Sequence, residues 1–148
     1  MFGRNEMEVV AVCISEKKGQ RKKEVPELRL RLGHGIEGDA HAGNWHRQVS
    51  LLGEESIDRM RALGLTLTPG AFAENIVTRG LTLYNLPVGT RLRIGSALLA
   101  VTQIGKECHN DCAIKRATGS CVMPTEGIFA IVLAGGTIRP GDLIEVIS

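Results

Sequence analysis

Short apolar stretches, separated by polar and glycine-rich stretches, run along most of the chain, and this pattern predicts mainly strands. Residues 8–15 contain the run Val-Val-Ala-Val-Cys-Ile, which is apolar and rich in β-branched side chains, as is typical of a buried strand. Residues 25–32 alternate leucine with charged residues, the period-two pattern of a strand with one buried face. Gly95 and Ser96 are a two-residue hairpin signal. Further strands or extended pieces are expected at residues 49–52, 75–77, 84–86, 91–94, 97–104, 128–133 and 143–147.

One clear helix interrupts this β pattern. It is expected to open at residues 53–56 and to end near Leu63, because Ile57 and Met60 recur at helical spacing and Gly64 fits a helix C-cap. A run of βαβ units is not visible in the sequence. The pattern therefore predicts a predominantly β barrel or sandwich with one or two short helices.

The composition limits the domain count and the kind of core. The chain has 148 residues, a length that favours one domain over residues 1–148, with its core at about 8–147. Its 18 glycines are dispersed, which excludes a collagen-like repeat and implies many turns. Three Phe, one Tyr and one Trp are the only aromatic residues. We therefore expect an aliphatic core, and a pocket built on ring stacking is disfavoured.

The net charge and the hydropathy of the chain bear on whether it binds nucleic acid or a membrane. The formal net charge of +2 is too small to indicate a nucleic-acid partner. The apolar run at residues 9–14 is shorter than a signal-peptide core or a membrane helix. We therefore expect a soluble, cytoplasmic protein with no membrane association. The charged stretch at residues 16–24 is interpreted as a solvated hairpin tip, because no aromatic residues are interleaved with it for base stacking.

Three thiols lie close together late in the chain: Cys108, Cys112 and Cys121, with Lys106 and His109 beside the first. One interpretation is a nucleophilic or sulfur-carrying thiol, since a reactive cysteine must be a thiolate and neighbouring cations favour that form. A zinc site is a second interpretation, because cysteine sulfur and histidine nitrogen are zinc ligands, although a second paired cysteine knuckle is absent. In a third, the thiols are small buried hydrophobes, as we expect for the cysteine of the first predicted strand.

Residues 33–43 form a loop with four glycines, which cannot be a regular element. Such a loop can present backbone N–H groups to an anion, although it matches neither a Walker A pattern nor the dinucleotide fingerprint. The alternative is a tight turn with incidental polar residues. The candidate binding residues in and after the loop are Gly38, Asp39, His41, His46 and Arg47.

A further candidate contact follows the turn at Pro69 and Gly70, where Glu74 and Asn75 precede a predicted strand. A glutamate next to an asparagine offers both acceptor and donor groups to an amide-rich heterocycle. The alternative is a structural turn with an asparagine cap.

The candidate segments fall in a specific order along the chain. They are Gly-Ile-Glu-Gly-Asp-Ala-His-Ala-Gly at 35–43, His-Arg-Gln-Val-Ser-Leu-Leu at 46–52, Gly-Ala-Phe-Ala-Glu-Asn-Ile at 70–76, Leu-Pro-Val-Gly-Thr at 86–90, Gly-Lys-Glu-Cys-His at 105–109, Gly-Ser-Cys-Val-Met-Pro at 119–124, Glu-Gly-Ile-Phe-Ala at 126–130 and Arg-Pro-Gly-Asp at 139–142. Together they resemble the MOSC domain, the C-terminal domain of molybdenum-cofactor sulfurases. The chain looks most like the short, stand-alone bacterial members of that family.

The resemblance implies a mostly β, barrel-like fold and binding of the pterin of the molybdenum cofactor (molybdopterin). It also implies that one cysteine carries sulfur as a persulfide received from a pyridoxal-phosphate cysteine desulfurase, a partner whose domain this chain lacks. We place that cysteine at Cys108, with Cys112 and Cys121 as alternative carriers or resolving thiols, and with Lys106 and His109 holding the charged sulfur. The residues expected to line the cofactor site are Gly38, Asp39, His41, His46, Arg47, Glu74, Asn75 and Lys106, and none is assigned to a bare metal ion.

The function expected from this resemblance is a sulfur carrier, which would make the protein a sulfurtransferase. It would relay sulfane sulfur to the molybdenum cofactor, to a molybdoenzyme or to another metal–sulfur centre. Two alternatives stay open: a binding module that holds the molybdenum cofactor or a related pterin without transferring sulfur, and a small zinc-stabilised protein without catalysis. A carrier and a binder need the same pocket, so the sequence does not separate them.

Overall fold

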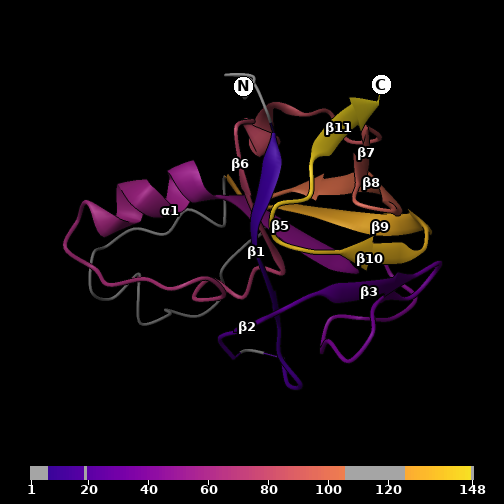
Figure 1. Cartoon of the computed structure of the whole chain (residues 1–148), viewed down its shortest axis with the longest axis horizontal. Helices are drawn as coiled ribbons and strands as arrows, with labels where there is room; N and C mark the ends of the chain where they lie inside the picture. The colour runs from indigo at the N-terminus through magenta and orange to yellow at the C-terminus, as the bar shows by residue number, and fades with distance from the viewer. Residues whose placement is uncertain (1–6, 19, 106–125, 148) are drawn as a thin grey trace.

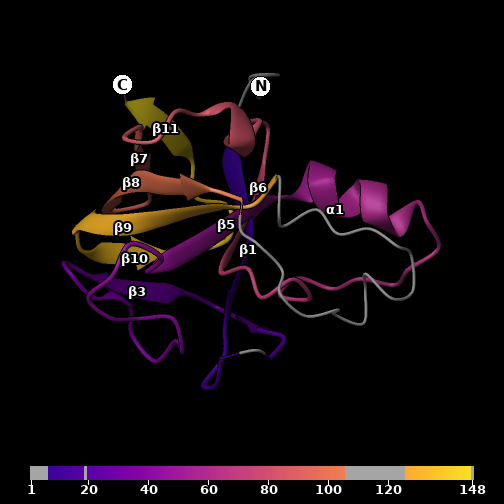
Figure 2. The same ribbon diagram turned by 180° about the vertical axis from the view of Figure 1, so that it is seen from behind.

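Two β-sheets form the framework of the protein (Figures 1 and 2). In the computed structural model, which describes residues 7–18, 20–105 and 126–147, the larger sheet has the strand order β11-β7-β8-β9-β5-β6-β1-β2 and the smaller one the order β10-β3-β4. The prediction of a mainly β fold is confirmed, and the two sheets are not closed into a barrel. The elements are β1 (Glu8–Ile14), β2 (Lys23–Val25), β3 (Leu28–Arg31), β4 (Gly35–Ile36), β5 (Val49–Gly53), α1 (Glu54–Arg61), β6 (Ile76–Arg79), the 3₁₀ helix η1 (Leu83–Asn85), β7 (Arg91–Ile94), β8 (Ala97–Ile104), β9 (Ile128–Ala134), β10 (Gly136–Ile138) and β11 (Ile144–Ile147).

Strands β8, β9 and β5 are neighbours in the middle of the larger sheet. The predicted turn at Gly95 and Ser96 joins β7 to β8, and the two strands pair antiparallel. Strand β8 then pairs with β9 up to the contact between Ile104 and Ile128, and β9 pairs with β5 on its other side. Ile104 ends β8 and Ile128 begins β9, and the two residues are paired. The segment between them, which carries the three clustered cysteines, therefore starts and ends at the same edge of the central strands.

Strand β5, helix α1 and strand β6 form a βαβ unit, an arrangement that the sequence pattern did not reveal. Strand β5 pairs parallel with β6, with Leu51 opposite Ile76, while the other strand pairs of the described residues are antiparallel. Parallel neighbours require a crossover connection, and here α1 and the turn after it provide the crossover. Figure 1 shows α1 projecting from the side of the larger sheet.

Helix α1 ends earlier than its apolar spacing predicts. Ile57 and Met60 are buried as expected, but the helix stops at Arg61, and Leu63 is 57% exposed. Gly64 follows in the left-handed region with φ +98°, and its N–H donates to the Arg61 carbonyl at 2.9 Å. The glycine therefore terminates the helix as predicted, and Leu63 falls in the terminating turn rather than on the buried face.

Three other predictions differ from the observed elements. The glycine-rich stretch 33–43 is predicted to hold no regular element, but Gly35 and Ile36 form the short strand β4, which pairs with β3. Residues 25–32 were expected to be one strand, but they divide into β2 and β3 at Pro26. Proline has no N–H group for a sheet, so the chain changes partner there, and β3 joins the smaller sheet. Residues 84–86 were expected to be extended, but most of them lie in the single turn of η1.

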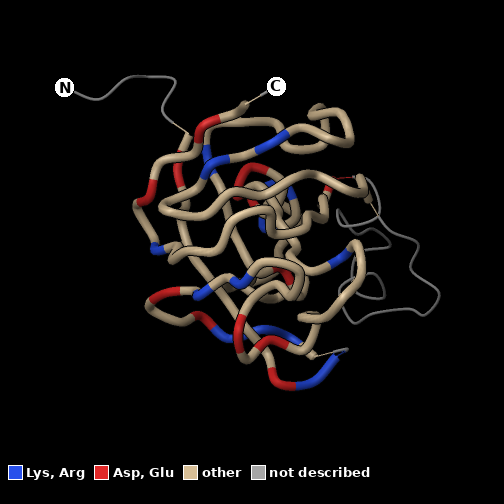
Figure 3. Tube along the Cα trace, turned by 90° about the vertical axis from the view of Figure 1, so that its right-hand side faces the viewer, with Lys and Arg blue, Asp and Glu red and all other residues tan. Residues whose placement is uncertain are grey.

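Aliphatic side chains fill two buried clusters. The larger lies between the two sheets and includes Leu28, Leu51 and Leu92, and the smaller lies under α1 and includes Ile57 and Phe129. Acidic and basic residues are interspersed along the described trace (Figure 3), in keeping with the low net charge. In the described ranges, no helix has the length and the apolar character needed to cross a membrane.

The turn before β6 packs backbone against backbone at Gly70. The Lys22 N–H donates to the Gly70 carbonyl at 2.9 Å, so the two segments are in direct contact. Gly70 has φ +92°, and a Cβ atom at this position would lie 2.0 Å from the Lys22 carbonyl oxygen. Both the conformation and the close approach therefore require glycine.

We predict that Gly70→Ala destabilises the protein much more than Gly64→Ala does. Both glycines have positive φ, so each alanine carries a conformational cost of about 1–2 kcal/mol, but a Cβ at Gly64 meets nothing within 4 Å. The clash with the Lys22 backbone should add roughly 1–3 kcal/mol at Gly70. Urea unfolding of both variants measures the difference, and equal losses would show that the close approach is not a constraint.

Candidate functional site

Lys22 is buried beneath the glycine-rich loop, so the interpretation of residues 16–24 as a solvated tip is wrong for this residue. Its side chain is 0% exposed, and its Nζ donates to Asp39 Oδ1 at 2.8 Å. The Asp39 side chain is also 0% exposed. A buried charge is tolerated when it is paired and hydrogen-bonded, and each of these two residues supplies that pairing for the other.

Asp39 organises the predicted binding loop around this ion pair. Its Oδ1 also accepts the N–H of Ser15 at the end of β1, and its Oδ2 accepts the N–H of His41, both at 3.1 Å. Lys22 Nζ in turn reaches Ser15 Oγ at 3.2 Å and His41 Nδ1 at 2.9 Å. The predicted residues Asp39 and His41 are therefore brought together, the first buried and the second half-buried, while Gly38 forms an exposed turn with φ +82°.

Aromatic and basic side chains gather around Trp45, directly after the loop. The His41 ring lies parallel to the indole with centroids 6.4 Å apart. The Arg47 guanidinium carbon lies 5.0 Å from the Trp45 ring and 5.6 Å from the Phe129 ring, and Lys18 Nζ lies 5.0 Å from the Trp45 ring. Such contacts between cations and rings are attractive. The predicted residues His41, His46 and Arg47 therefore all lie beside a ring, although the chain has few aromatics.

Arg47 carries a hydrogen-bond donor that has no acceptor among the described residues. Its Nε atom is buried and has no hydrogen-bond partner among the described residues. Buried donors nearly always have an acceptor, and an unpaired one calls for an explanation. A guanidinium is planar and presents its N–H groups in one plane, which suits the oxygens of a phosphate or carboxylate. The arrangement therefore fits an anionic group such as the phosphate of a cofactor.

His46 ties this loop to the end of β8. Its Nε2 lies 2.7 Å from Gln103 Oε1, and Gln103 Nε2 donates to the Gly105 carbonyl at 2.8 Å. The Gly105 N–H donates in turn to the Gly127 carbonyl at 2.6 Å, and Thr102 Oγ1 donates to the His46 carbonyl. Both ends of the cysteine-bearing segment are thus fastened beside the loop that holds His46 and Arg47.

Glu74 lies in the core and not at the surface. Its side chain is fully buried, and its two carboxylate oxygens accept the N–H groups of Gly70 and Phe72, each at 2.9 Å. Burial raises the pKa of Glu74, and the hydrogen bonds from Gly70 and other backbone groups, together with the charge of Lys22, oppose that rise. This carboxylate closes its own turn, which corresponds to the structural alternative weighed for the segment.

Asn75 connects three strands from an equally buried position. Its Oδ1 accepts the Ser50 N–H, and its Nδ2 donates to the Cys13 carbonyl, both at 3.0 Å. Its own N–H donates to the Ser50 carbonyl at 2.9 Å. The amide therefore joins β1, β5 and the start of β6, and its polar atoms bind neighbouring backbone.

The predicted sulfur chemistry lies outside the described residues, because Lys106, Cys108, His109, Cys112 and Cys121 all fall between residues 105 and 126. Cys13 is described and buried, and desolvation, with smaller contributions from Glu74 and Glu24, raises its pKa to about 12. Its thiol is therefore protonated at neutral pH and a poor nucleophile. Within the described ranges no group of three or more His, Cys, Asp or Glu side chains is placed to hold a metal ion.

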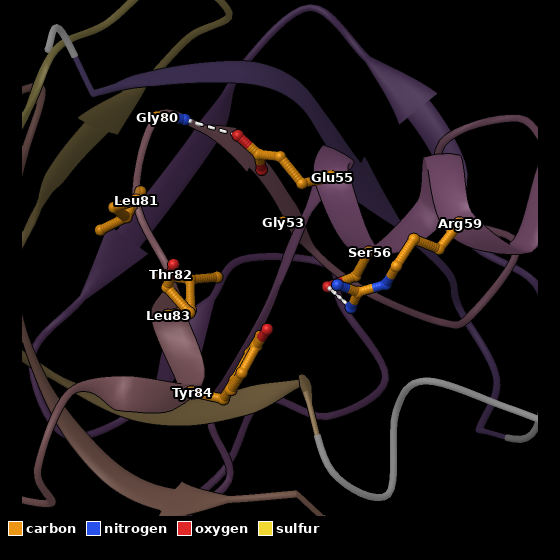
Figure 4. A pocket seen from close by; sticks show the side chains of 9 residues that line it. All are labelled: Gly53, Glu55, Ser56, Arg59, Gly80, Leu81, Thr82, Leu83 and Tyr84. Carbon is orange, nitrogen blue, oxygen red and sulfur yellow. Dashed lines mark hydrogen bonds between the residues drawn. The ribbon is translucent and has the colours of Figure 1, made fainter.

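A pocket of about 420 Å³ lies where the parallel strands β5 and β6 end (Figure 4). Ser56 and Arg59 of α1 form one wall, and Tyr84 points its hydroxyl toward them from η1. Ser56 Oγ donates to Glu126 Oε1 at 2.6 Å, and Arg59 forms an ion pair with the same carboxylate. The first described residue after the cysteine-bearing segment is therefore bound to this wall. The lining residues are Gly53, Glu55, Ser56, Arg59, Gly80, Leu81, Thr82, Leu83 and Tyr84.

The fold is thus a mainly β framework with one βαβ unit, whose central strands bring a glycine-rich loop next to Gly105 and Gly127, the described residues that flank the cysteine-bearing segment. The family model of the MOSC domain matches residues 38–145. The chain belongs to the MOSC domain family, as its motifs predicted, and this family is named for the C-terminal domain of molybdenum-cofactor sulfurases.

Solved structures with the same fold extend the match over nearly the whole chain. The YuaD protein from Bacillus subtilis is 22% identical, with 99% of this chain and 98% of that chain covered and a TM-score of 0.79. YiiM from Geobacillus stearothermophilus is 21% identical, with 96% and 75% covered and a TM-score of 0.71. YiiM from Escherichia coli is 25% identical, with 97% and 70% covered and a TM-score of 0.68. No curated protein sequence matches this chain significantly.

Sequence reasoning missed several residues of the site, among them Lys18, Phe129, Lys22, Trp45 and Gln103. Nothing local separates Lys22 from the exposed Lys23 beside it, since both lie in the same charged stretch. Trp45 had a usable signal, because the chain's single tryptophan stands between the glycine-rich loop and two predicted binding residues. Gln103 lies near the end of a regular strand pattern and carries no such signal.

We predict that Lys22→Met strongly destabilises the protein, whereas Lys23→Met leaves its stability nearly unchanged. Removing one partner of a buried ion pair leaves Asp39 uncompensated, at a cost of about 3–5 kcal/mol. Lys23 is exposed, so its substitution should change stability by less than about 0.5 kcal/mol. Chemical denaturation at neutral pH measures both, and similar small effects would mean that Asp39 does not depend on Lys22.

We also predict that Glu74→Gln removes a component of the pH dependence of stability. The pKa of Glu74 in the folded protein is raised above 4.5. Protonation of Glu74 therefore adds to the free energy of unfolding, and this contribution is fully present below the pKa of the unfolded state. It is lost as the pH rises through the folded pKa. Urea unfolding over a pH series measures this slope in the wild type and its absence in the variant.

Glu27 is the matched control for that series. Hydrogen bonding from Arg29 is the largest cause that lowers its pKa, so its contribution is present above pH 4.5 and is lost as the pH falls through the folded pKa. Glu27→Gln should therefore change the slope of the unfolding free energy against pH in the direction opposite to the change caused by Glu74→Gln. Identical slopes in wild type and Glu74→Gln would contradict the raised pKa.

Proposed function

We propose that this protein is a sulfur carrier for the molybdenum cofactor. One observation carries the proposal: Gly105 and Gly127, which border the cysteine-bearing segment, are hydrogen-bonded to each other, and Gln103 links Gly105 to His46. The two described ends of the cysteine-bearing segment are therefore held beside the basic loop by the sheet itself. A donor tethered beside a bound acceptor gains chiefly from proximity.

Arg47 and Lys18 would hold the anionic part of the cofactor. The unpaired Nε of Arg47 fits a phosphate oxygen, and the contacts with Trp45 and Phe129 keep the guanidinium in place. Lys18 adds a second positive charge beside the same indole. His41 and His46 would contribute polar contacts at the margin of this site. The bound cofactor would supply the metal centre that accepts sulfur.

The loading of sulfur onto the carrier thiol is a sulfane transfer with no net redox change. The Cys108 thiolate attacks the outer sulfur of a persulfide on a partner cysteine desulfurase, a new S–S bond forms, and the partner's thiolate leaves. Lys106 and His109 would stabilise the charged sulfur on Cys108. Cys13 is excluded as the carrier because its thiol stays protonated.

Delivery of the sulfur requires a second thiol. Cys112 or Cys121 would attack the inner sulfur of the Cys108 persulfide, forming a disulfide and releasing the outer sulfur as hydrosulfide for the acceptor. The two electrons that reduce the sulfane sulfur come from the pair of thiols. A dithiol reductant would then restore both thiols, which closes the cycle.

We expect the wild-type protein to gain one sulfur atom when it is incubated with a cysteine desulfurase and L-cysteine, as measured by whole-protein mass. Cys108→Ala should abolish the gain, because it removes the attacking thiolate. Cys13→Ala is the matched control and should gain sulfur at the wild-type level.

Two outcomes would change the proposal. If Cys108→Ala gains sulfur like the wild type, another cysteine is the carrier. If the protein gains no sulfur but retains molybdenum cofactor after alanine replaces Cys108, Cys112 and Cys121 together, the protein is a cofactor-binding module and not a carrier.

A further inference from the structure

The floor of the pocket beside α1 is open because residue 53 has no side chain. Gly53 has φ −73° and ψ 141°, an extended conformation that any residue adopts, so its backbone does not require glycine. Residues with a hydroxyl, amide or carboxylate side chain are preferred at a helix N-cap, and the side-chain hydrogen bond that they provide is absent here. A Cβ atom on Gly53 would lie 3.1 Å from Glu55 Oε1 and 3.9 Å from Thr78 Oγ1. The space that glycine leaves open is therefore bordered by a carboxylate and a hydroxyl group.

Thr78 turns a buried hydroxyl group toward this space. It pairs with Gly53 across the parallel strands β5 and β6. Because side chains alternate between the two faces of a strand, Thr78 lies on the face of Ile76, and Gly53 lies on the face of Leu51. Ile76 and Leu51 both belong to the larger buried cluster, so the two faces are the same side of the sheet. Thr78 is 0% exposed, and its Oγ1 has no hydrogen-bond partner among the described residues, so a polar ligand group over Gly53 would supply a missing partner.

Glu55 presents a carboxylate oxygen to the same space. Its Oε2 accepts the Gly80 N–H at 2.8 Å, which holds the carboxylate across the pocket (Figure 4). Its Oε1 has no hydrogen-bond partner among the described residues. The backbone therefore fixes one oxygen and leaves the other as an acceptor beside Gly53.

The charges around the pocket leave one carboxylate in excess. Arg59 forms an ion pair with Glu126, and Arg79 forms one with Glu54. Glu55 forms no ion pair among the described residues, and its charge is the smallest of the causes that raise the pKa of Arg79, after the hydrogen bond and the charge of Glu54. Glu54 and Glu55 both lie in the first turn of α1, where they offset the positive end of the helix dipole. The floor of the pocket therefore favours a cation over an anion.

We propose that this pocket is a second binding site, which takes a primary ammonium group carried on an apolar or aromatic body. The ammonium donates to Glu55 Oε1 and to Thr78 Oγ1 over the open floor at Gly53, since it has three donors and no acceptor. The body of the ligand lies against Leu83 and the ring of Tyr84, which line the rest of the pocket (Figure 4). A quaternary ammonium has no N–H donor and an alcohol has no charge, so neither matches both groups.

This site is independent of the sulfur-carrier proposal. None of the residues that line the pocket belongs to the predicted cofactor site, which gathers around Trp45. Loss of amine binding would leave the loading of sulfur unaffected, and a failure of sulfur loading would leave the amine site intact. The two proposals therefore fail separately.

Titration of the full-length, ¹⁵N-labelled protein with 2-phenylethylamine at neutral pH tests the site. We expect saturable shifts of the amide signals of Gly53, Gly80 and Thr82. The N,N,N-trimethyl derivative of this amine and 2-phenylethanol keep the aromatic body, but the first lacks N–H donors and the second lacks the charge. Each should bind at least roughly tenfold more weakly than the amine. Equal binding of either analogue, or no saturable shift with the amine, would overturn the proposal.

A pair of neighbouring glutamates separates binding in the pocket from general attraction of a cation. Glu55→Gln should weaken binding of 2-phenylethylamine by about tenfold or more, because the charged acceptor is lost while glutamine keeps an oxygen for the Gly80 N–H. Glu54→Gln is the matched control, since it removes the same charge one position earlier in α1, from a carboxylate that is paired with Arg79. It should change the affinity little. Equal weakening by the two substitutions would refute a specific site.

Gly53→Ala tests the open floor itself. The added methyl group would first meet the end of the Glu55 side chain, which can move, so the variant should fold. It should nevertheless lose at least roughly tenfold in affinity for 2-phenylethylamine, because the methyl group takes the place of the ammonium beside Thr78. Wild-type affinity in a folded Gly53→Ala variant would contradict the proposal. If the variant does not fold, the comparison of Glu55→Gln with Glu54→Gln decides.

Discussion

The buried ion pair between Lys22 and Asp39 is the contact on which the rest of the site depends. The Lys22 side chain joins the end of β1 to the glycine-rich loop, through Ser15 and Asp39. Its backbone meets the turn at Gly70, at a distance that leaves no room for a side chain. Because a charge taken out of water must keep its partner, these three segments hold one another in a fixed arrangement.

The sheet brings the chemistry of distant motifs together. Strands β5, β8 and β9 are neighbours, so the loop before β5 lies beside both ends of the segment between β8 and β9. The same strands hold Phe129 against Arg47. The crossover between the parallel strands β5 and β6 packs α1 over the smaller buried cluster, beside the pocket that Ser56 and Arg59 line. A small protein with few aromatics thus places a tryptophan and a phenylalanine where they orient one arginine.

The predicted site residues divide into two groups once the fold is known. Asp39, His41, His46 and Arg47 surround Trp45 or the ion pair beneath it. Glu74 and Asn75 instead bond to backbone in the core, where they hold turns and strands in place. Sequence spacing cannot separate these roles, because a carboxylate or an amide is equally suited to a ligand and to an unpaired N–H group.

By itself the sequence determined the strand-rich class, the helix after Gly53, the hairpin at Gly95 and the membership of the MOSC family, because these follow from local periodicity, turn chemistry and motif order. Only the tertiary structure decided which lysine of a charged stretch is buried, that β5 and β6 run parallel, and which buried donor of the described residues lacks an acceptor. Those features depend on contacts between residues far apart in the chain. Burial then sets their energy, since a charge or a hydrogen bond matters most where water is excluded.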